Sequence, residues 1–365
     1  MKRTLMQFRS IDWLFVCAVF ALVLIGLAAI YSIALSQNDY LNFNKQLFAV
    51  FIGAIIFFVM AFSNYRLLRN YALVLYILAG VSLVSVLFFG ENIRGTTGWF
   101  SFGFVSIQPV EFVKLVIIIV LAAYFSNRAR NSFGLKELAE SGAIVLLFVF
   151  LIFAQPDLGS ALLVIGLWCV MMLFAGIKKR YFLSLCLLAL IASIFSWSFL
   201  FADYQKARIT TFIDPASDPL GQGYNVAQAV IAVGSGGWFG RGLGFGSQSQ
   251  LKFLPESHTD FIFAVIAEEL GFVGMLLIVG AFGVIFWKIY HYASMTRDSF
   301  TSYLMLGVGT ILFLQLFVNI GMNLGLLPVT GLGLPLVSYG GSSIIFTFLL
   351  LGIVASVALH TKMSR

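Results

Sequence analysis

Long apolar runs are the feature that most constrains how this chain can fold. A helix that crosses a bilayer needs about 20 mostly apolar residues. The chain is 61% hydrophobic and 10% charged, with a mean hydropathy of +1.00, whereas soluble domains carry roughly 25% charged residues. The pattern predicts an all-α polytopic membrane protein, one transmembrane domain over residues 1–365. Its ten predicted spans cover residues 12–34, 45–63, 71–90, 107–126, 141–154, 158–177, 181–202, 259–290, 301–325 and 341–360.

The basic residues indicate which side of the membrane each loop occupies. Ten spans place both termini on one side, and a cytoplasmic assignment puts 15 of the 22 Lys and Arg residues inside and six outside, with Lys114 within a span. This distribution follows the positive-inside rule. The net charge of +7 is thereby explained by topology, and no nucleic-acid partner is expected. Residues 203–258 form the single large extracytoplasmic loop, and acidic residues gather on the same outer side.

The eighth predicted span is too long for a simple crossing. At 1.5 Å per residue, residues 259–290 would measure about 48 Å, against a bilayer core of about 30 Å. This span must therefore tilt, break or protrude. Its outer end lies in the stretch "FLPESHTDFIFAVIAEELGFVG", which holds several ionisable residues in a chain with few acids.

Glu111 and Lys114 stand three residues apart in the fourth span and therefore share one helical face. Insertion of either charge alone costs about 3 kcal/mol on translocon scales, so we expect the two to neutralise each other, to face a polar cavity, or both. A purely structural ion pair between helices is the alternative. The fourth span runs inward from the outside, which places this pair in the outer half of the membrane.

Other acids at the outer side have both a structural and a functional interpretation. Asp157 follows Pro156 and is expected to cap the sixth span, a role that does not exclude a site role. Asp260 can be a first-turn acid of the eighth span, capped by His258 or Thr259. Glu268 and Glu269 lie two turns further in and project about 100° apart, so at most one of them shares the sector of Asp260.

The outer loop adds cations and glycines. Lys206 and Arg208 are either solvated loop charges or ligands for an anionic lipid head group, which suits an Arg fork. The stretch "GSGGWFGRGLGFG" is either a flexible linker or a loop whose N–H groups approach a ligand. The stretch "GLLPVTGLGLPLVSYGGSS" has no charge and breaks the helical pattern at membrane depth, which requires burial in protein or a wet cavity.

Together these features suit transfer chemistry on a lipid that carries phosphate and sugar. A carboxylate at the rim of an outward cavity can take a proton from an attacking hydroxyl, and nearby cations can stabilise a departing phosphate. Composition alone does not separate such an enzyme from a transporter, which also carries charges inside the membrane.

Five segments resemble the RodA/FtsW/SpoVE (SEDS) proteins of bacterial elongation, division and sporulation. They are "RGTTGWFSFGFVSIQPVEFVKL", "AQPDLGSALL", "RITTFIDPASDPLGQGYNVAQAVIAVGSGGWFGRGLG", "FLPESHTDFIFAVIAEELGFVG" and "GLLPVTGLGLPLVSYGGSS", within residues 94–343. The wording of "GSQSQLKFLPESHTDFIFA" and "LLPVTGLGLP" is most similar to the RodA branch.

The resemblance implies a multi-pass protein of the bacterial cytoplasmic membrane that polymerises lipid II into glycan strands at the outer face during elongation and rod-shape maintenance. It implies that Asp260 is the base for the acceptor hydroxyl in a single inverting displacement. It further implies that Glu111, Lys114, Asp157 and Arg208 match family positions; His258, Lys206 and Glu268 complete the expected cavity or substrate-binding set.

The resemblance also implies a partner, a class B penicillin-binding protein that cross-links the strands. No tightly bound cofactor and no dense carboxylate cage for a metal is expected, although a divalent cation, Mg²⁺ or Mn²⁺, can accompany the substrate diphosphate. Two other functions stay open: a flippase for lipid-linked precursor, with Glu111 and Lys114 as gating charges, and a scaffold without chemistry. The sequence shows no internal repeat of the kind many transporters carry.

Overall fold

The computed structural model describes residues 11–93, 96–103, 105–128, 133–199, 203–214, 218, 221–251 and 253–363. Within this part, ten helices of 18 residues or more stand at the ten predicted spans. They are α2 (Trp13–Gln37), α3 (Leu41–Phe62), α5 (Ala72–Phe89), α6 (Pro109–Arg128), α7 (Leu135–Phe153), α8 (Leu158–Ala175), α9 (Lys179–Phe199), α13 (Ile262–Met295), α14 (Ser299–Asn323) and α15 (Gly341–Met363). Eight of them, all except α7 and α9, are long and apolar enough to cross a membrane by length and composition.

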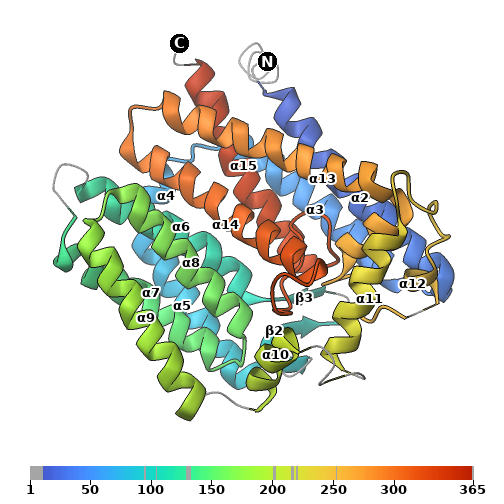
Figure 1. The fold of residues 1–365 in the computed structure, drawn as a ribbon. Helices are drawn as coiled ribbons and strands as arrows, with labels where there is room; N and C mark the ends of the chain where they lie inside the picture. Colours follow the sequence, from blue (N-terminus) through green and yellow to red (C-terminus); the bar gives the residue numbers. More distant parts are fainter. Residues whose placement is uncertain are drawn as a thin grey trace.

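The two ends of the helix bundle carry different parts of the chain. In Figure 1 the long helices run obliquely, and the start of α2 and the end of α15 lie near each other at the upper end of the picture. The shorter helices α10 (Asp203–Ile213), α11 (Gln222–Ser235) and α12 (Ser247–Gln250) and the strands lie towards the opposite end. This arrangement agrees with an even number of crossings. Several basic residues used for the sidedness prediction lie outside the described residues: Lys2, Arg3, Arg9, Arg94, Arg130, Lys252 and Arg365.

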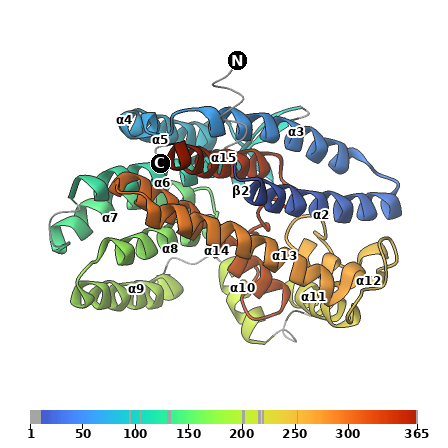
Figure 2. The ribbon, with the colours of Figure 1, turned by 90° about the horizontal axis from the view of Figure 1, so that it is seen from above.

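The core of the bundle is built on α6, α14 and α15. Seen from above in Figure 2, these three helices lie in the interior, whereas α9 and α12 lie at edges. Helix α6 packs against α14 and α5, and α15 packs along α3. Helix α6 is fully buried on all sides from Val116 to Ile119, while α9 exposes most of its apolar side chains. In a membrane, this outer apolar surface meets lipid.

A small antiparallel sheet corrects the prediction of an all-α protein. Strands β1 (Glu91–Ile93), β2 (Thr96–Phe102) and β3 (Val105–Ile107) form it in the order β1-β2-β3, with Phe100 opposite Ile107 and Ser101 opposite Ser106. The stretch "TTGWFSF" is rich in β-branched and aromatic residues, which favour strands. Strands this short do not register in hydropathy windows of helix length, so the hydropathy pattern does not predict the sheet.

The eighth long helix, α13, is interrupted near its start. Gly271 within α13 has φ 65° and ψ −159°, which is not helical. The glycine-rich loop, defined here as residues 236–246, wraps around this break. The N–H groups of Arg241 and Gly242 donate to the carbonyls of Glu268 and Glu269, at 3.0 and 2.9 Å. The loop is thus not a flexible linker, because its backbone pairs with groups that the broken helix leaves open.

Candidate active site

Asp260 lies immediately before α13 and is held by its backbone. The N-cap of α13 is Phe261 and no acid occupies its first turn, so the predicted first-turn position of Asp260, with His258 or Thr259 as cap, is wrong. The Asp260 carbonyl instead accepts hydrogen bonds from the side-chain amides of Asn319 (3.1 Å) and Asn323 (2.9 Å) of α14. Both asparagines are fully buried. The Asp260 side chain itself is half-buried, so it combines a fixed backbone with access from outside the core.

The uncharged connection between α14 and α15 packs directly on the segment that carries Asp260. The Ser338 hydroxyl donates to the Thr259 carbonyl (2.6 Å), and the Tyr339 N–H donates to the His258 carbonyl (2.8 Å). The rings of His258 and Tyr339 meet edge to face, with centroids 5.5 Å apart. Residues 334–338 of this connection are therefore buried against protein, whereas Leu326 and Gly331 are exposed.

A glycine faces the Asp260 carboxylate. A β-carbon added at Gly331 would lie 3.9 Å from Asp260 Oδ2, and the backbone at Gly331 has φ 77°. Any side chain there would be strained and would point towards the carboxylate. Glycine thus keeps the space beside the carboxylate open.

Residues 329–331 bring three parts of the predicted site together. Val329 lines a hollow that also contains Arg208, the carbonyl of Thr330 contacts Gly159 in the first turn of α8, and Gly331 faces Asp260. Two consecutive chain steps span at most about 7 Å. The Arg208 hollow, the start of α8 with Asp157, and Asp260 therefore converge on one short piece of chain.

The Arg208 hollow lies between α10, α11 and the start of the α14–α15 connection. It has a volume of about 290 Å³, part of it open to solvent, and its polar lining comes from Arg208, Thr211 and Gln222. Lys206 stands two residues before Arg208 on α10 and is half-buried. An arginine with hydroxyl and amide neighbours in an open hollow suits an anionic group such as phosphate.

Asp157 caps α8, as the sequence predicted. Its carboxylate accepts from the Ser160 N–H at 3.0 Å. Beside it, Gln155 is fully buried and donates through Nε2 to the Leu83 carbonyl at 3.3 Å. The Thr330 carbonyl lies against Gly159 in the first turn of α8, which places this helix end at the site.

Glu111 and Lys114 form the predicted ion pair in the first two turns of α6. Lys114 Nζ lies 2.7 Å from Glu111 Oε1, and the two side chains are 3% and 12% exposed for lysine and glutamate. The start of α6 is fixed to the start of α15 because the Ser342 hydroxyl accepts from the Gln108 N–H (3.0 Å) and donates to the Ser106 carbonyl (2.7 Å). The pair is thus nearly enclosed by protein near the start of α6.

The structure gives Glu268 a different role from the predicted cavity position. Glu268 is fully buried, and its carboxylate accepts from the N–H groups of Gln248 (2.9 Å) and Ser249 (3.1 Å). The neighbouring Glu269 accepts from the Ser32 hydroxyl at 2.6 Å. Glu268 contacts α12, and Glu269 contacts α2 and the glycine-rich loop, so the two acids anchor these segments to α13. This geometry does not agree with a cavity-lining role for Glu268.

Several residues that shape the site were not singled out from the sequence. Asn319 and Asn323 stand four apart on α14, and amides at this spacing in a membrane helix are a readable signal that they share a polar task. Gln46 of α3 accepts from the Gly340 N–H (3.0 Å) and donates to the Ser338 carbonyl (3.1 Å). Gln46, Ser338 and Ser342 act only through tertiary contacts, which sequence spacing does not encode.

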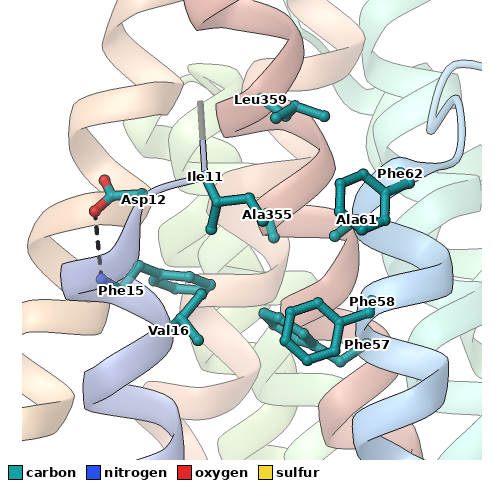
Figure 3. A pocket seen from close by; sticks show the side chains of 10 residues that line it. All are labelled: Ile11, Asp12, Phe15, Val16, Phe57, Phe58, Ala61, Phe62, Ala355 and Leu359. Carbon is teal, nitrogen blue, oxygen red and sulfur yellow. Dashed lines mark hydrogen bonds between the residues drawn. The ribbon is translucent and has the colours of Figure 1, made fainter. Parts of the chain in front are cut away.

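A second hollow lies at the opposite end of the bundle, near the chain termini. Figure 3 shows its lining, which is apolar except for Asp12. The Asp12 carboxylate is turned away from the phenylalanine rings and accepts from the Phe15 N–H. It also contacts Lys288 Nζ (2.7 Å) and the Tyr292 hydroxyl (2.6 Å). This hollow carries no candidate chemistry.

Within the described residues, no group of three or more His, Cys, Asp or Glu side chains is placed to hold a metal ion. Asp260 faces a glycine, Asp157 is engaged as a cap, and Glu111 is paired with lysine.

The chain is similar to known proteins along almost its whole length. The family model for FtsW, RodA and SpoVE, described as a cell cycle protein, matches residues 9–363. The peptidoglycan glycosyltransferase MrdB of Escherichia coli K12 is 38% identical over 363 residues, which cover 99% of this chain and 97% of that protein. The rod shape determining protein RodA of Thermus thermophilus has a similar structure, with a TM-score of 0.71 at 30% identity, over 95% of this chain and 96% of that one.

A chain from a study of polymerisation and cross-linking by a peptidoglycan synthase complex is similar as well. It matches with a TM-score of 0.81 at 34% identity, over 96% of this chain and 98% of that one.

Proposed function

The chain belongs to the FtsW, RodA and SpoVE family of cell cycle proteins, and from this membership we propose that it is a peptidoglycan glycosyltransferase. Its reaction is the polymerisation of lipid II into glycan strands at the outer face of the bacterial cytoplasmic membrane, in cell elongation and rod-shape maintenance. The observation that carries the proposal is the half-buried Asp260, fixed by two buried asparagines, beside a hollow that holds Arg208.

In the proposed step, Asp260 acts as general base. The oxygen of the acceptor sugar 4-hydroxyl attacks the anomeric carbon of the donor, the hydroxyl proton passes to the Asp260 carboxylate, and the bond from that carbon to the lipid diphosphate breaks. The configuration inverts, so one base suffices and no covalent nucleophile is required. General-base catalysis of this kind contributes typically about 10²–10⁴-fold to a rate.

The leaving diphosphate needs positive charge, and the outer loop supplies it. Arg208 with Thr211 and Gln222 offers hydrogen-bond donors in the open hollow, and Lys206 adds a second cation on α10. We propose that this hollow holds the diphosphate of one lipid substrate, with Asp157 and the N-terminus of α8 bordering the reaction space. Lys114, held by Glu111, places a further cation at the outer end of α6. A divalent cation would enter with the substrate diphosphate and supply further neutralisation of its charge.

A class B penicillin-binding protein is the proposed partner. The support is the similarity to a chain from a complex that coordinates polymerisation and cross-linking. A polymerase at the outer face delivers its strands where such a transpeptidase works. The proposed topology, with both termini cytoplasmic, is supported by the positions of the termini and of α10–α12 at opposite ends of the bundle.

The test is glycan synthesis by the purified chain in detergent or nanodiscs, given lipid II with a fluorescent stem peptide. Polymers should form without an energy source, and their yield should respond to the transpeptidase partner. A flippase would instead move labelled lipid II between the leaflets of proteoliposomes and make no polymer. Translocation without polymer would contradict the proposed function, and polymer without translocation would exclude the flippase.

A further inference from the structure

The glycine-rich loop, residues 236–246, is held rigidly against the break in α13. Besides the bonds from Arg241 and Gly242, the Phe272 and Val273 N–H groups donate to the carbonyls of Gly237 (2.9 Å) and Trp238 (3.1 Å). The Gly244 N–H donates to Glu269 Oε1 at 3.2 Å. The close approach requires glycine, since a β-carbon at Gly240 would collide with the Glu269 carbonyl. The loop conformation is therefore fixed by backbone pairing.

This rigid loop points large apolar side chains away from the protein. Trp238, Phe239 and Phe245 are among the most exposed large apolar side chains of the described residues, at 70%, 83% and 76%, and Leu243 beside them is 49% exposed. A fixed backbone cannot fold these side chains back into the core. Contiguous exposed apolar surface of this kind marks a contact with a membrane or another protein.

The loop lies at the outer membrane interface. Glu269, which the loop contacts, also accepts from Ser32, and Ser32 precedes the end of α2 at Gln37 by five residues, about 8 Å of helix. Figures 1 and 2 show α11 and α12, which flank the loop, at an edge of the bundle near the outer end of α2. With the predicted topology, this level is where a bilayer's head groups meet its acyl chains.

The exposed surface of the loop continues into the lipid-facing side of α13. The Trp238 ring packs on Phe272, with centroids 5.2 Å apart. One turn further along α13, Leu276 and Leu277 are 58% and 56% exposed. Because α13 crosses the membrane from this point, the aromatic patch and the lipid-facing helix form one surface.

The charge of the surrounding segment favours lipid head groups. Residues 219–255 contain two cations, Arg241 and Lys252, and no acid. Tryptophan and other aromatic residues concentrate at membrane interfaces, and basic residues there attract anionic head groups. A transpeptidase surface could also cover an apolar patch, but the continuity with α13 points to lipid.

We propose that the glycine-rich loop is an outer-leaflet membrane anchor. Trp238, Phe239, Leu243 and Phe245 insert among the head groups and upper acyl chains, and Arg241 lies at the level of the phosphates. Since the same loop holds residues 268–273, the anchor sets the depth of the first part of α13 relative to the bilayer. Asp260 precedes that part, so the anchor also fixes the depth of the proposed base.

Site-directed spin labelling measures this immersion directly. Phe239→Cys and Phe245→Cys are made separately in a chain whose three native cysteines are replaced, labelled with a nitroxide, and placed in nanodiscs of phosphatidylethanolamine and phosphatidylglycerol. Glu91→Cys in β1, which is exposed at the same end of the molecule, is the matched control. Collision rates with oxygen, which enriches in lipid, are compared with those of a water-soluble nickel chelate.

The proposal predicts an oxygen-to-nickel collision ratio several-fold higher at positions 239 and 245 than at position 91. Equal ratios at the three positions would overturn it. Protection of 239 and 245 that develops only after a class B penicillin-binding protein is added would also overturn it, and would identify a protein interface instead. Two separate loop positions keep the test intact if one variant fails to fold.

A second measurement needs no label. Lipids brominated near the head group should quench part of the tryptophan fluorescence, and Trp238→Phe should remove that part. Unchanged quenching in Trp238→Phe would contradict insertion of this side chain.

Discussion

Glu111 and Lys114 show how a membrane helix tolerates full charges. Removing one member of a nearly enclosed pair leaves the other without compensation, which typically costs about 3–5 kcal/mol, whereas replacing both is close to neutral. We therefore predict that Lys114→Met lowers the unfolding temperature in detergent, and that Glu111→Gln with Lys114→Met restores most of it. Glycan synthesis should stay impaired in both. A double variant as unstable as the single one would show that the two charges are not coupled.

Asp12 provides a prediction with a defined pH dependence. Burial raises its pKa, but the hydrogen bonds from Lys288 and Tyr292 outweigh burial, so the pKa lies below its usual value of 3.8. A lowered pKa means that the carboxylate stabilises the fold above its usual pKa, and that this contribution is lost as the pH falls through the lowered value.

Asp12→Asn should accordingly destabilise the chain at neutral pH, by about 3 kcal/mol, and the difference from wild type should shrink as the pH drops below about 4. Thermal unfolding in detergent across this range measures it. Asp39→Asn is the control, because Asp39 is exposed. A difference that stays constant with pH would contradict the ion-pair account.

At the scale of elements, the break in α13 is the feature that most clearly requires glycine. A β-carbon at Gly271 would collide with the backbone of the glycine-rich loop, and its φ of 65° disfavours any side chain. Gly271→Ala should therefore destabilise the chain by about 1–3 kcal/mol. Gly280→Ala in the same helix is the matched control, since a β-carbon there meets nothing within 4 Å. Equal unfolding temperatures for the two variants would show that the break does not need glycine.

Helix positions could be predicted from the sequence because the thickness of the bilayer sets the length of each apolar run. Each predicted span overlaps one long helix, and the excess length of residues 259–290 correctly indicated a break, tilt or protrusion. The sheet and the pairing of the glycine-rich loop with residues 268–273 could not be predicted. Both depend on backbone hydrogen bonds between segments whose contacts leave no periodic pattern in the side chains.

For the molecule as a whole, sidedness is the testable property. A membrane-impermeant maleimide added to intact cells should label Glu91→Cys, and should label Arg297→Cys, between α13 and α14, only after permeabilisation. Both positions are exposed, so access depends on the side of the membrane alone. Labelling of Arg297→Cys in intact cells would overturn the proposed topology.

The site itself could be predicted only in part. The charges gave Asp157 as a cap and Glu111 with Lys114 as a pair, because partners three residues apart on one helix can be read from spacing. The sequence predicts a cavity position for Glu268. Its burial against the loop could not be predicted, because it depends on partners about 20 positions away. The convergence of Arg208, Asp157 and Asp260 on residues 329–331 is a property of the packed bundle.

The central claim is that Asp260 accepts the proton of the acceptor hydroxyl, and the rate of lipid II polymerisation by Asp260→Asn tests it most directly. The side chains of Asn319 and Asn323 bind the main-chain carbonyl of residue 260, which the substitution does not change. The variant should therefore unfold at the wild-type temperature. Its polymerisation rate should fall by at least about 100-fold, while Asp39→Asn retains the wild-type rate. Polymerisation by a folded Asp260→Asn chain at close to the wild-type rate would contradict the claim.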